Sequence, residues 1–597
     1  MPNSQVKIET IRHSLSHIMA FAVGQFYPDV KFGIGPAIEN GFYYDFDFSK
    51  SSKLKAQSPK PQLKTQSISE EDLLKIEKKM RQLIKQNLEF TKKEISKKEA
   101  LTLFKNQQYK IELIKGLSDD TVTIYQNGDF TDLCAGPHIN STKEIDPKAF
   151  KLTKLSGAYW RGDEKNQMLT RIYGVAFDSE RELTDYLHNL EEAEKRDHRK
   201  IGTQLDLFSF HEQAPGMPFF HPKGTIVYNL LYEFWRNTQK KFNYDFVIAP
   251  SMLDTAIWKK SGHWDHYKDD MYFTTTDKNE KQYALRPMDC PGAIIIYNDS
   301  PKSYRNLPLR YAEPGLITRK EKSGQLGGLF RVQQFKQDDA HIFITESQIE
   351  NEIKQVIKLV DEIYQPFGLS YMPYLSTRPD DFMGDIASWN KAEVALKKIL
   401  NDVYGQDKWG LKEKDGAFYG PKIDYQLKDS LSRTWQCATI QLDFQMPLKF
   451  DCKYSDKDGK EKTPVLIHRT IMGSFERFMG ILLEHYAGAL PLWLAPEQIW
   501  VAPIGEKHLE YARQVTQDLM ADTCPSTLRV KLIDANETIG KKIREAQLQK
   551  IPYVLVVGDK EVASKTVAVR HREQGDLGTI SLEKFLERVK MELINFR

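Results

Sequence analysis

The sequence predicts a multidomain protein of mixed α/β fold class, and three observations support this prediction. The chain has 597 residues, which exceeds what a single hydrophobic core normally organises. Residues 201–494 form a long block rich in aromatic residues and short apolar segments. Residues 495–597 then alternate between apolar strand-like and amphipathic helix-like segments. Such alternation indicates a separate small α/β domain at the C-terminal end.

The first block begins with a predicted helix at 7–26, a Gly/Pro turn at Gly33–Pro36 and an aromatic segment at Phe42–Phe46. One face of the helix is apolar at helical spacing. Its members are Ile8, Ile11, Leu15, Ile18 and Met19. Ser, Lys, Gln and Pro dominate residues 49–68, where no aromatic residue occurs. We therefore expect a flexible insertion there.

A second helix is predicted from Ser69, because the Ser69-x-x-Asp72 spacing is a variant of the capping box. Apolar residues follow at helical spacing, at Leu73, Ile76, Met80, Leu83 and Ile84. A charged linker helix is expected at 179–200. Its buried side should consist of Leu183, Leu187 and Leu190.

The C-terminal block is predicted to contain a small domain with a mainly parallel sheet. The predicted strands are Ile499–Pro503, Leu528–Ile533 and Tyr553–Val557. The predicted helices between them are Leu509–Met520 and Ile539–Gln549.

The composition is typical of a protein that folds in water. Hydrophobic residues make up 40% and charged residues 28% of the chain. No apolar run reaches the ~20 residues that span a membrane, and Met1–Thr10 has no apolar signal-peptide core. Five cysteines form an odd, sparse set that argues against a disulfide scaffold. We therefore expect a cytoplasmic protein with no membrane partner, and its net charge of +3 neither requires nor excludes a nucleic acid.

Three residues of the central block are of types that bind zinc, namely Cys290, His341 and His468. They are far apart along the chain, so spacing alone leaves open a metal site or buried structural side chains. The strings around the central-block site are long and unusual. They are Arg286-Pro-Met-Asp-Cys-Pro291, Phe335-Lys-Gln-Asp-Asp-Ala-His-Ile-Phe343, Phe418-Tyr-Gly-Pro-Lys-Ile-Asp424 and Gly473-Ser-Phe-Glu-Arg477. Through them, residues 201–494 resemble the catalytic domain of threonyl-tRNA synthetases, which belong to class II.

This resemblance implies an antiparallel catalytic sheet flanked by helices, with one Zn²⁺ per subunit on Cys290, His341 and His468. Three protein ligands leave a position free for substrate, and the resemblance implies that the amino and hydroxyl groups of threonine bind the metal there. Asp339 would hold the ammonium group, although the residue alone also fits a solvated turn carboxylate. Valine lacks the hydroxyl, and a site that requires a polar ligand rejects such an analogue by about 10⁴–10⁵.

Activation of the amino acid consumes ATP, so cations must be fixed around the phosphates. Arginine suits this role because its planar fork binds phosphate in a bidentate way. The resemblance implies ATP with Mg²⁺ and assigns substrate and ATP contacts to Arg319, Glu321, Arg331, Gln337, Asp339, Tyr419, Lys422, Gln436, Thr439, Gln441, Ser474 and Arg477. The chain has no P-loop pattern, and no Gly-x-Gly-x-x-Gly follows a predicted strand, which fits class II chemistry.

His13 and His17 are four residues apart on the first predicted helix and share one face. Residue 14 is Ser, which excludes the metalloprotease pattern. The string Asp132-Leu-Cys-Ala-Gly-Pro-His138 forms a second cluster. By themselves these residues fit either structural histidines or a second zinc site.

Bacterial-type threonyl-tRNA synthetases carry similar clusters in a hydrolytic editing domain. The resemblance therefore assigns hydrolysis of serine wrongly attached to tRNA to His13, His17, Lys110, Asp132, Cys134 and His138. Serine lacks only a methyl group, worth about 1–3 kcal/mol of discrimination, so a second site must remove the error. Histidine and lysine with pKa values near neutral could orient or activate the attacking water.

Residues 495–597 resemble the anticodon-binding domain of several class II synthetases. Asn536, Glu561 and Arg570 fall at positions that contact anticodon bases, and the forked donors of Asn and Arg suit base edges in a single-stranded loop. A surface ion pair between Glu561 and Arg570 is the alternative.

The resemblance covers nearly the whole chain and predicts its domains. They are an α+β editing domain at 1–178, the linker helix at 179–200, the catalytic domain at 201–494 and the anticodon-binding domain at 495–597. The implied partners are tRNA(Thr), ATP, L-threonine and a second subunit, because the motif around Pro250 usually lies at a homodimer interface.

Four departures from the family pattern are visible. We expect the small ubiquitin-like N-terminal module of many bacterial members to be missing, and residues 49–68 to be inserted. Thr318 and Lys320 stand where the family often has His and Asn, and Ala135 where it commonly has Arg, which bears on ATP affinity and editing rate. Two functions remain, a working ligase and a paralogue that regulates through RNA binding without charging. The complete zinc and arginine set favours the ligase.

Overall fold

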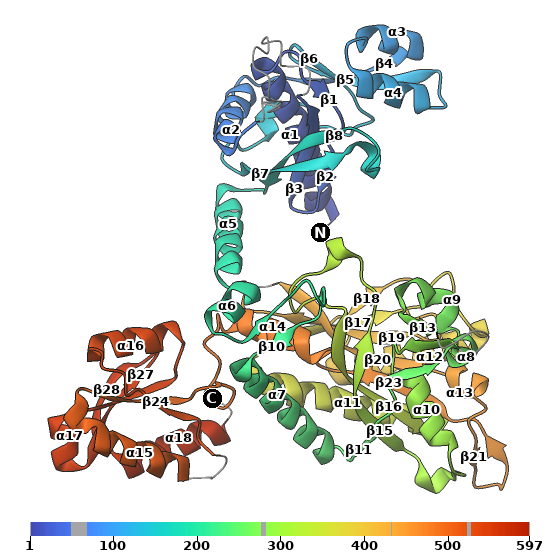
Figure 1. Cartoon of the computed structure of the whole chain (residues 1–597). Coiled ribbons are helices and arrows are strands. Elements are labelled where there is room, and N and C mark those ends of the chain that lie inside the picture. The colour runs from blue at the N-terminus through green and yellow to red at the C-terminus, as the bar shows by residue number, and fades with distance from the viewer. Residues whose placement is uncertain (1, 49–67, 276–281, 432, 522–526, 596–597) are drawn as a thin grey trace. The chain divides into compact units, whose positions relative to one another are not determined.

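The structure is a computed structural model that describes residues 2–48, 68–275, 282–431, 433–521 and 527–595. The chain divides into two compact units, Met1–Glu191 and Glu192–Arg597 (Figure 1). Within the described ranges, no helix combines the length and apolarity needed to cross a membrane.

A long helix and an antiparallel sheet form the core of the first unit. Helix α1 (Pro2–Phe26) packs on a sheet of order β1-β3-β8-β7, with β2 paired to β3. The strands are β1 (Lys31–Phe32), β2 (Ala37–Ile38), β3 (Gly41–Asp47), β7 (Phe150–Tyr159) and β8 (Met168–Ala176). The apolar face predicted for the first helix is buried, as are Phe42, Tyr44 and Phe46 of β3. Both predictions are confirmed.

Helix α2 (Glu70–Ile84) begins where the capping pattern predicted. The Ser69 N–H donates to Asp72 Oδ2 at 3.0 Å, and all five predicted apolar positions are buried. A three-stranded sheet follows, made of β4 (Phe90–Ser96), β5 (Thr121–Asn127) and β6 (Phe130–Leu133), with α3 (Lys97–Leu103) and α4 (Gln108–Gly116) between β4 and β5 in the chain. The predicted insertion 49–68 lies outside the described residues except for Ile68, which is buried.

The linker segment contains two helices rather than the single one predicted. Helix α5 (Glu180–Lys195) ends, and α6 (His198–Gln204) starts after Asp197, whose carboxylate accepts from the Arg199 N–H at 2.8 Å. A capping carboxylate of this kind favours a new helix start over continuation. Leu183 is buried as predicted, but Leu190 is 51% exposed, so the predicted buried side is too long.

An eight-stranded sheet organises the larger part of the second unit, in the order β11-β15-β16-β23-β20-β19-β17-β18. Its strands are β11 (Asp245–Phe246), β15 (Leu309–Thr318), β16 (Gln334–Ile344), β23 (Val465–Thr470), β20 (Thr434–Asp443), β19 (Lys422–Lys428), β17 (Ser370–Ser376) and β18 (Gly410–Lys412). Only the short edge strands β11 and β18 pair in parallel. The predicted antiparallel sheet is confirmed.

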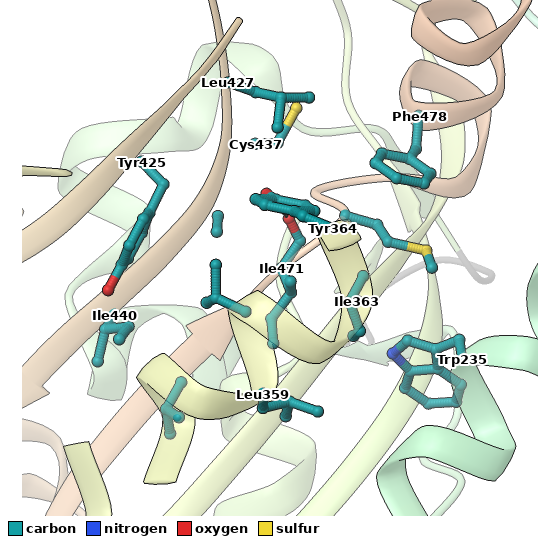
Figure 2. Packing of buried hydrophobic residues seen from close by; sticks show 14 of the residues in the cluster. Trp235, Leu359, Ile363, Tyr364, Tyr425, Leu427, Cys437, Ile440, Ile471 and Phe478 are labelled. Carbon is teal, nitrogen blue, oxygen red and sulfur yellow. Dashed lines mark hydrogen bonds between the residues drawn. The ribbon is translucent and has the colours of Figure 1, made fainter. Parts of the chain in front are cut away.

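Helices cover this sheet and supply its core. They are α7 (Pro222–Lys241), α11 (Ile349–Tyr364), α12 (Ile386–Tyr404) and α14 (Phe475–His485). Figure 2 shows Tyr364 of α11 packed among Cys437, Ile471 and Phe478. The Tyr364 hydroxyl donates to the Ile471 carbonyl at 2.5 Å, which anchors the turn that follows β23.

Smaller elements surround the main sheet. The short helices are α8 (Thr255–Ser261), α9 (His263–Tyr267), α10 (Cys290–Asn298) and α13 (Gln445–Lys449). The short strands are β9 (Phe208–Ser209), β10 (Phe219–Phe220), β12 (Met252–Asp254), β13 (Phe273–Thr275), β14 (Gln282–Leu285), β21 (Tyr454–Ser455) and β22 (Glu461–Lys462).

The C-terminal sheet has the order β25-β24-β26-β27-β28. Its elements are β24 (Ile499–Pro503), α15 (Leu509–Ala521), β25 (Val530–Leu532), α16 (Ile539–Leu548), β26 (Tyr553–Val557), α17 (Asp559–Ser564), β27 (Thr566–His571), β28 (Gly575–Ser581) and α18 (Leu582–Ile594). The predicted strands and helices are confirmed within a few residues. The first three strands pair in parallel, but β27 and β28 pair antiparallel, so the sheet is mixed rather than mainly parallel.

Candidate active site

Two histidines of the central sheet face each other on neighbouring strands. His341 on β16 and His468 on β23 are direct partners in the antiparallel register, so their side chains leave the same face. Their ring centroids are 5.0 Å apart. Cys290, the first residue of α10, joins them, and the donor atoms of the three side chains lie within 4.8 Å of one another. The structure thus brings together the three residues predicted to bind zinc.

The donor chemistry of this cluster fits Zn²⁺. His341 Nδ1 is buried and has no hydrogen-bond partner among the described residues, a costly state unless a ligand binds it. His468 Nε2 lies 2.9 Å from Asp443 Oδ2, a carboxylate contact of the kind that orients metal-bound imidazoles. Burial raises the pKa of the Cys290 thiol well above its usual range, and a metal ion would favour the thiolate there.

A cavity of about 230 Å³ opens beside the cluster. Asp339, Gln337, Tyr419, Thr439 and Gln441 contribute to its walls. Tyr419 donates a hydrogen bond from its hydroxyl to Gln441. Burial, with the neighbouring carboxylate of Asp338 adding to it, raises the pKa of Asp339 to about 7. A cationic ligand in the cavity would stabilise the ionised form.

A second cavity, of about 380 Å³, shares Arg319, Gln337 and Thr439 with the first. It collects the other residues predicted to bind ATP, namely Glu321, Arg331, Gln436, Ser474 and Arg477. The Arg331 guanidinium pairs with Glu321 at 2.8 Å, and Arg319 lies 5.4 Å above the ring of Phe335. Three arginines on one cavity wall suit a ligand that carries several phosphates.

Lys422 is the predicted substrate residue that lines neither cavity. Its Nζ lies 3.0 Å from Asp424 Oδ2. The other carboxylate oxygen of Asp424 accepts from Gln436 Nε2 at 2.7 Å and Thr439 Oγ1 at 3.0 Å. The Lys422 side chain therefore contacts the cavity-wall residues Gln436 and Thr439 indirectly, through Asp424, and on the backbone Lys422 is the strand partner of Gln441.

The first unit contains another cluster, built from α1, α4, β6 and the residues that directly follow β6. Cys134 Sγ lies 3.4 Å from His13 Nε2 and 3.3 Å from His138 Nε2. Asp132 lies 3.3 Å from His17 Nδ1 and 2.6 Å from Lys110 Nζ. All six residues predicted for editing therefore meet at one place.

Burial controls protonation in this second cluster. It lowers the pKa of His138 to about 2, lowers those of His13 and His17, and raises that of Cys134 to about 11. The histidines are thus neutral and Cys134 is a thiol near pH 7. The pKa values of these histidines thus lie below the near-neutral range considered in the sequence analysis, because desolvation disfavours their charged forms.

Tyr44 belongs to the second cluster although no motif singled it out. Its hydroxyl donates to Asp132 Oδ2 at 2.5 Å and accepts from Lys110 Nζ at 3.0 Å. The sequence signal was only the alternation of Phe42, Tyr44 and Phe46, which places these side chains on one face of β3. Asp443, beside His468, was missed likewise because it is distant in sequence.

The three residues predicted to contact the anticodon lie in different settings. Asn536 is exposed between β25 and α16. Glu561 is buried, and its Oε2 accepts from the Gly558 N–H at 3.0 Å at the start of α17. Arg570 on β27 lies 3.8 Å from Asp576. This pairing differs from the Glu561–Arg570 pair considered as the alternative.

Three regions match models of known domain families. Residues 273–486 match the tRNA synthetase class II core domain (G, H, P, S and T), and 498–592 match the anticodon binding domain. Residues 122–173 match the threonyl and alanyl tRNA synthetase second additional domain. Together with the antiparallel sheet and its two cavities, these matches define a class II aminoacyl-tRNA synthetase with an editing domain.

Relatives specify the family. The threonine–tRNA ligase of Clostridium botulinum (strain Kyoto / Type A2) is 51% identical over 591 residues, which cover 98% of this chain and 89% of that protein. That of Clostridium tetani (strain Massachusetts / E88) is 50% identical over 590 residues, covering 98% and 88%. The chain belongs to the threonine–tRNA ligases. It joins threonine to tRNA with ATP and Mg²⁺, so its partners are threonine, ATP and tRNA.

A solved structure agrees with this assignment. The RNA binding domain of threonyl-tRNA synthetase from Cryptosporidium parvum Iowa II is 41% identical, with a TM-score of 0.63. The match covers 66% of this chain and 98% of that one.

Proposed function

We propose that Cys290, His341 and His468 hold one Zn²⁺ per subunit and that this site selects threonine. Bound there, the ion supplies Lewis-acid contacts for the amino and hydroxyl groups of the substrate. Asp339 accepts hydrogen bonds from the ammonium group in the 230 Å³ cavity. The observation that supports this most is the buried His341 Nδ1, which has no partner among the described residues.

ATP occupies the 380 Å³ cavity in this proposal. Arg331 and Arg477 bind its phosphates, and Glu321 holds Arg331 in place. Arg319 lines both cavities, so it contacts the threonine carboxylate and the α-phosphate together. A carboxylate oxygen attacks the α-phosphorus, pyrophosphate leaves, and fixed positive charge stabilises the transition state.

The cluster around Cys134 hydrolyses seryl-tRNA(Thr). Water attacks the ester carbonyl, and the tRNA hydroxyl leaves. Neutral His13 and His138 accept hydrogen bonds that orient the water. A thiol with a pKa near 11 is a poor nucleophile at neutral pH, which favours direct water attack over a covalent enzyme intermediate. The Lys110–Asp132–Tyr44 network keeps the cluster rigid.

The chain acts as a homodimer in this proposal. Ile248 is 90% and Met252 47% exposed on either side of Pro250. Apolar side chains this open are typical of a surface that a partner covers.

Asn536 contacts the anticodon from its exposed segment, and Arg570 and Glu561 remain predicted contacts. We expect Asn536→Ala to weaken tRNA(Thr) binding by about 1–3 kcal/mol, the usual worth of a base-edge contact. Threonine-dependent ATP–pyrophosphate exchange, which needs no tRNA, should stay at the parent rate. Unchanged tRNA affinity would contradict the assignment of Asn536.

The test of the whole proposal is charging of tRNA(Thr) by the zinc-loaded protein with threonine, valine and serine in parallel. We expect stable threonyl-tRNA, no valyl-tRNA and only transient seryl-tRNA. Valine charging would contradict the metal site, and stable seryl-tRNA would contradict the editing assignment.

A further inference from the structure

A histidine at the start of α6 contacts the backbone of a loop in the ATP cavity. His198 is 2% exposed, and its Nε2 lies 2.9 Å from the backbone nitrogen of Leu329. A backbone N–H can only donate, so His198 Nε2 accepts and carries no proton. The ring proton is therefore on Nδ1, which lies 2.7 Å from Glu484 Oε1 and donates to it.

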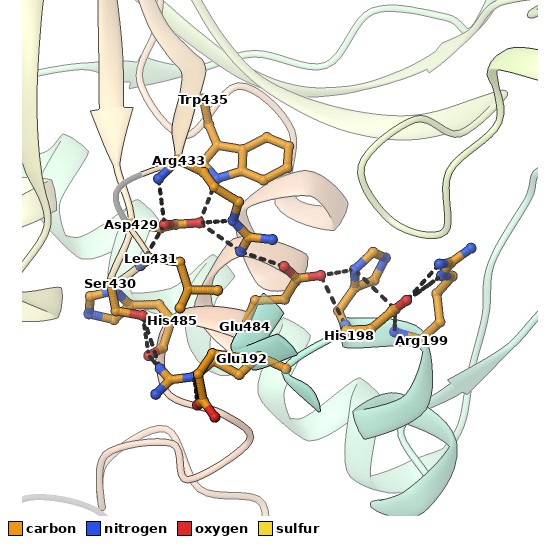
Figure 3. A network of polar contacts seen from close by, with 12 residues as sticks. Glu192, His198, Arg199, Asp429, Ser430, Leu431, Arg433, Trp435, Glu484 and His485 are labelled. Carbon is orange, nitrogen blue, oxygen red and sulfur yellow. Dashed lines mark hydrogen bonds and ion pairs between the residues drawn. The ribbon is translucent and has the colours of Figure 1, made fainter. Parts of the chain in front are cut away.

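Glu484 is fixed from two sides (Figure 3). Its Oε1 also accepts from the backbone N–H of His198 at 3.0 Å, and its Oε2 forms an ion pair with Arg433 Nη2 at 2.6 Å. Arg433 Nε in turn donates to Asp429 at 2.7 Å. Glu484 is 3% exposed, and a buried carboxylate with this set of partners holds His198 in one orientation.

The same residues could be mistaken for a metal site, since donor atoms of Asp197, His198 and Glu484 lie within 4.8 Å of one another. Both ring nitrogens of His198 are already engaged, and Glu484 is neutralised by Arg433. This arrangement leaves the imidazole no lone pair for an ion. The pair therefore serves to position its neighbours.

The loop at 327–331 is shaped to meet His198. Gly328 has φ +55°, and a Cβ there would lie 2.2 Å from His198 Nε2, so the approach requires glycine. The ring centroid of Phe330 lies 4.1 Å from that of His198 and 4.3 Å from that of Trp435. The Phe330 carbonyl accepts from Arg477 Nε at 2.8 Å. Phe330 and Arg331 both line the 380 Å³ cavity.

We propose that His198 and Glu484 form a positioning pair that fixes residues 327–331 so that Arg331 faces ATP. This inference rests on the proposed assignment of the cavity to ATP. His198 touches neither substrate, and it acts through the Leu329 N–H and the Phe330 ring. The first unit ends at Glu191 in the chain. His198, a few residues further on, thus helps to shape the ATP site of the second unit.

Two near-isosteric substitutions of His198 test the roles of its two ring nitrogens separately. His198→Asn places an amide at the Nδ1 position and keeps a donor for Glu484, but leaves the Leu329 N–H without an acceptor. His198→Gln extends an amide oxygen to the Nε2 position and keeps that acceptor. In threonine-dependent ATP–pyrophosphate exchange, we expect His198→Asn to raise the KM for ATP about tenfold, with the KM for threonine within about twofold of the parent. His198→Gln should restore most of the ATP KM.

Hydrogen exchange of peptides that cover 327–331 gives a second readout in the intact protein. The Leu329 amide should exchange faster in His198→Asn than in the parent or His198→Gln, while thermal melting confirms that all three are folded. Equal ATP KM values, or equal amide exchange, in the two variants would overturn the positioning pair. Arg477→Ala tests the cavity itself. If it raises the KM for ATP and His198→Asn does not, only the positioning pair fails, whereas no effect of Arg477→Ala means that the ATP assignment fails.

Discussion

The chain holds two clusters of one cysteine and several histidines, and they differ in what the ring nitrogens already contact. In the second unit, His341 Nδ1 is buried without a partner among the described residues. In the first unit, His13 Nδ1 lies 3.1 Å from the Pro137 carbonyl and His138 Nδ1 lies 3.0 Å from Ser14 Oγ. The Nε2 atoms of both face Cys134. The Nδ1 atoms of His13 and His138 are thus held by hydrogen bonds, whereas His341 Nδ1 is not.

The charges around the two clusters also favour a cation in the second unit more than in the first. Asp443 lies beside His468, and a carboxylate favours a bound cation. In the first unit, the ammonium of Lys110 lies at the Asp132 carboxylate, which neutralises the one charge that would favour an ion. The residue types alone are nearly the same in the two places. The charges beside each cluster are therefore what distinguishes the proposed metal site from the proposed hydrolytic site.

The largest effect is expected from Cys290→Ser. Loss of the thiolate should remove the zinc and lower threonine activation by about 10³-fold or more, since a Lewis acid contributes several kcal/mol. Zinc content and ATP–pyrophosphate exchange measure both consequences. Cys452→Ser is the matched control, because Cys452 is also buried but belongs neither to the metal-ligand group nor to the lining of the cavity. Full activity of a zinc-free Cys290→Ser protein would contradict the metal site.

Substitutions in the Cys134 cluster of the first unit should slow hydrolysis of seryl-tRNA(Thr) without changing the zinc content. We expect His13→Ala combined with Cys134→Ala to slow seryl-tRNA(Thr) hydrolysis by about 10²–10⁴-fold, the usual range for lost acid–base groups. Threonylation and the single zinc per chain should remain at parent levels. Two zinc ions in the parent and one in this variant would remove the distinction between the clusters.

The smallest effect is a pH dependence of the first unit's stability. The pKa of His138 is about 2 in the folded chain, against an ordinary value of 6.5. The groups that face it are Ser14 and the titratable side chains of His13, His17, Tyr125, Asp132 and Cys134. Below pH 6.5 the unfolded chain binds a proton that the folded chain does not. The contribution of His138 is therefore complete above this pH and is lost progressively as pH falls towards 2. At pH 5.5 the loss is about 1.4 kcal/mol.

Hydrogen exchange of peptides from α1 at pH 7.5 and 5.5, corrected for the intrinsic rate, measures this loss. Peptides from α15 serve as the internal control, and His138→Asn should reduce the pH dependence. Equal protection of α1 at both pH values would show that burial does not depress the histidine pKa.

The sequence predicted local features well and contacts between distant residues poorly. Strands β24 and β26 match their predicted bounds because each is a continuous apolar run between polar segments. The antiparallel pairing of β27 was not foreseen, since parallel and antiparallel partners leave no distinct local pattern. The break at Asp197 was missed because a capping carboxylate in a charged helix resembles any other acidic residue. The motifs located both clusters, but Tyr44, Asp443 and the His198–Glu484 pair depend on the fold alone.

The direct register of His341 opposite His468 has a consequence for folding. Side chains alternate between the faces of a sheet, so a slip of β23 by one residue against β16 would turn one imidazole to the opposite face. An ion held by both rings would bind only the correctly aligned strands and would stabilise that alignment by its own binding free energy. The ion of the proposed threonine site would then also favour the correct alignment of the sheet on which it is bound.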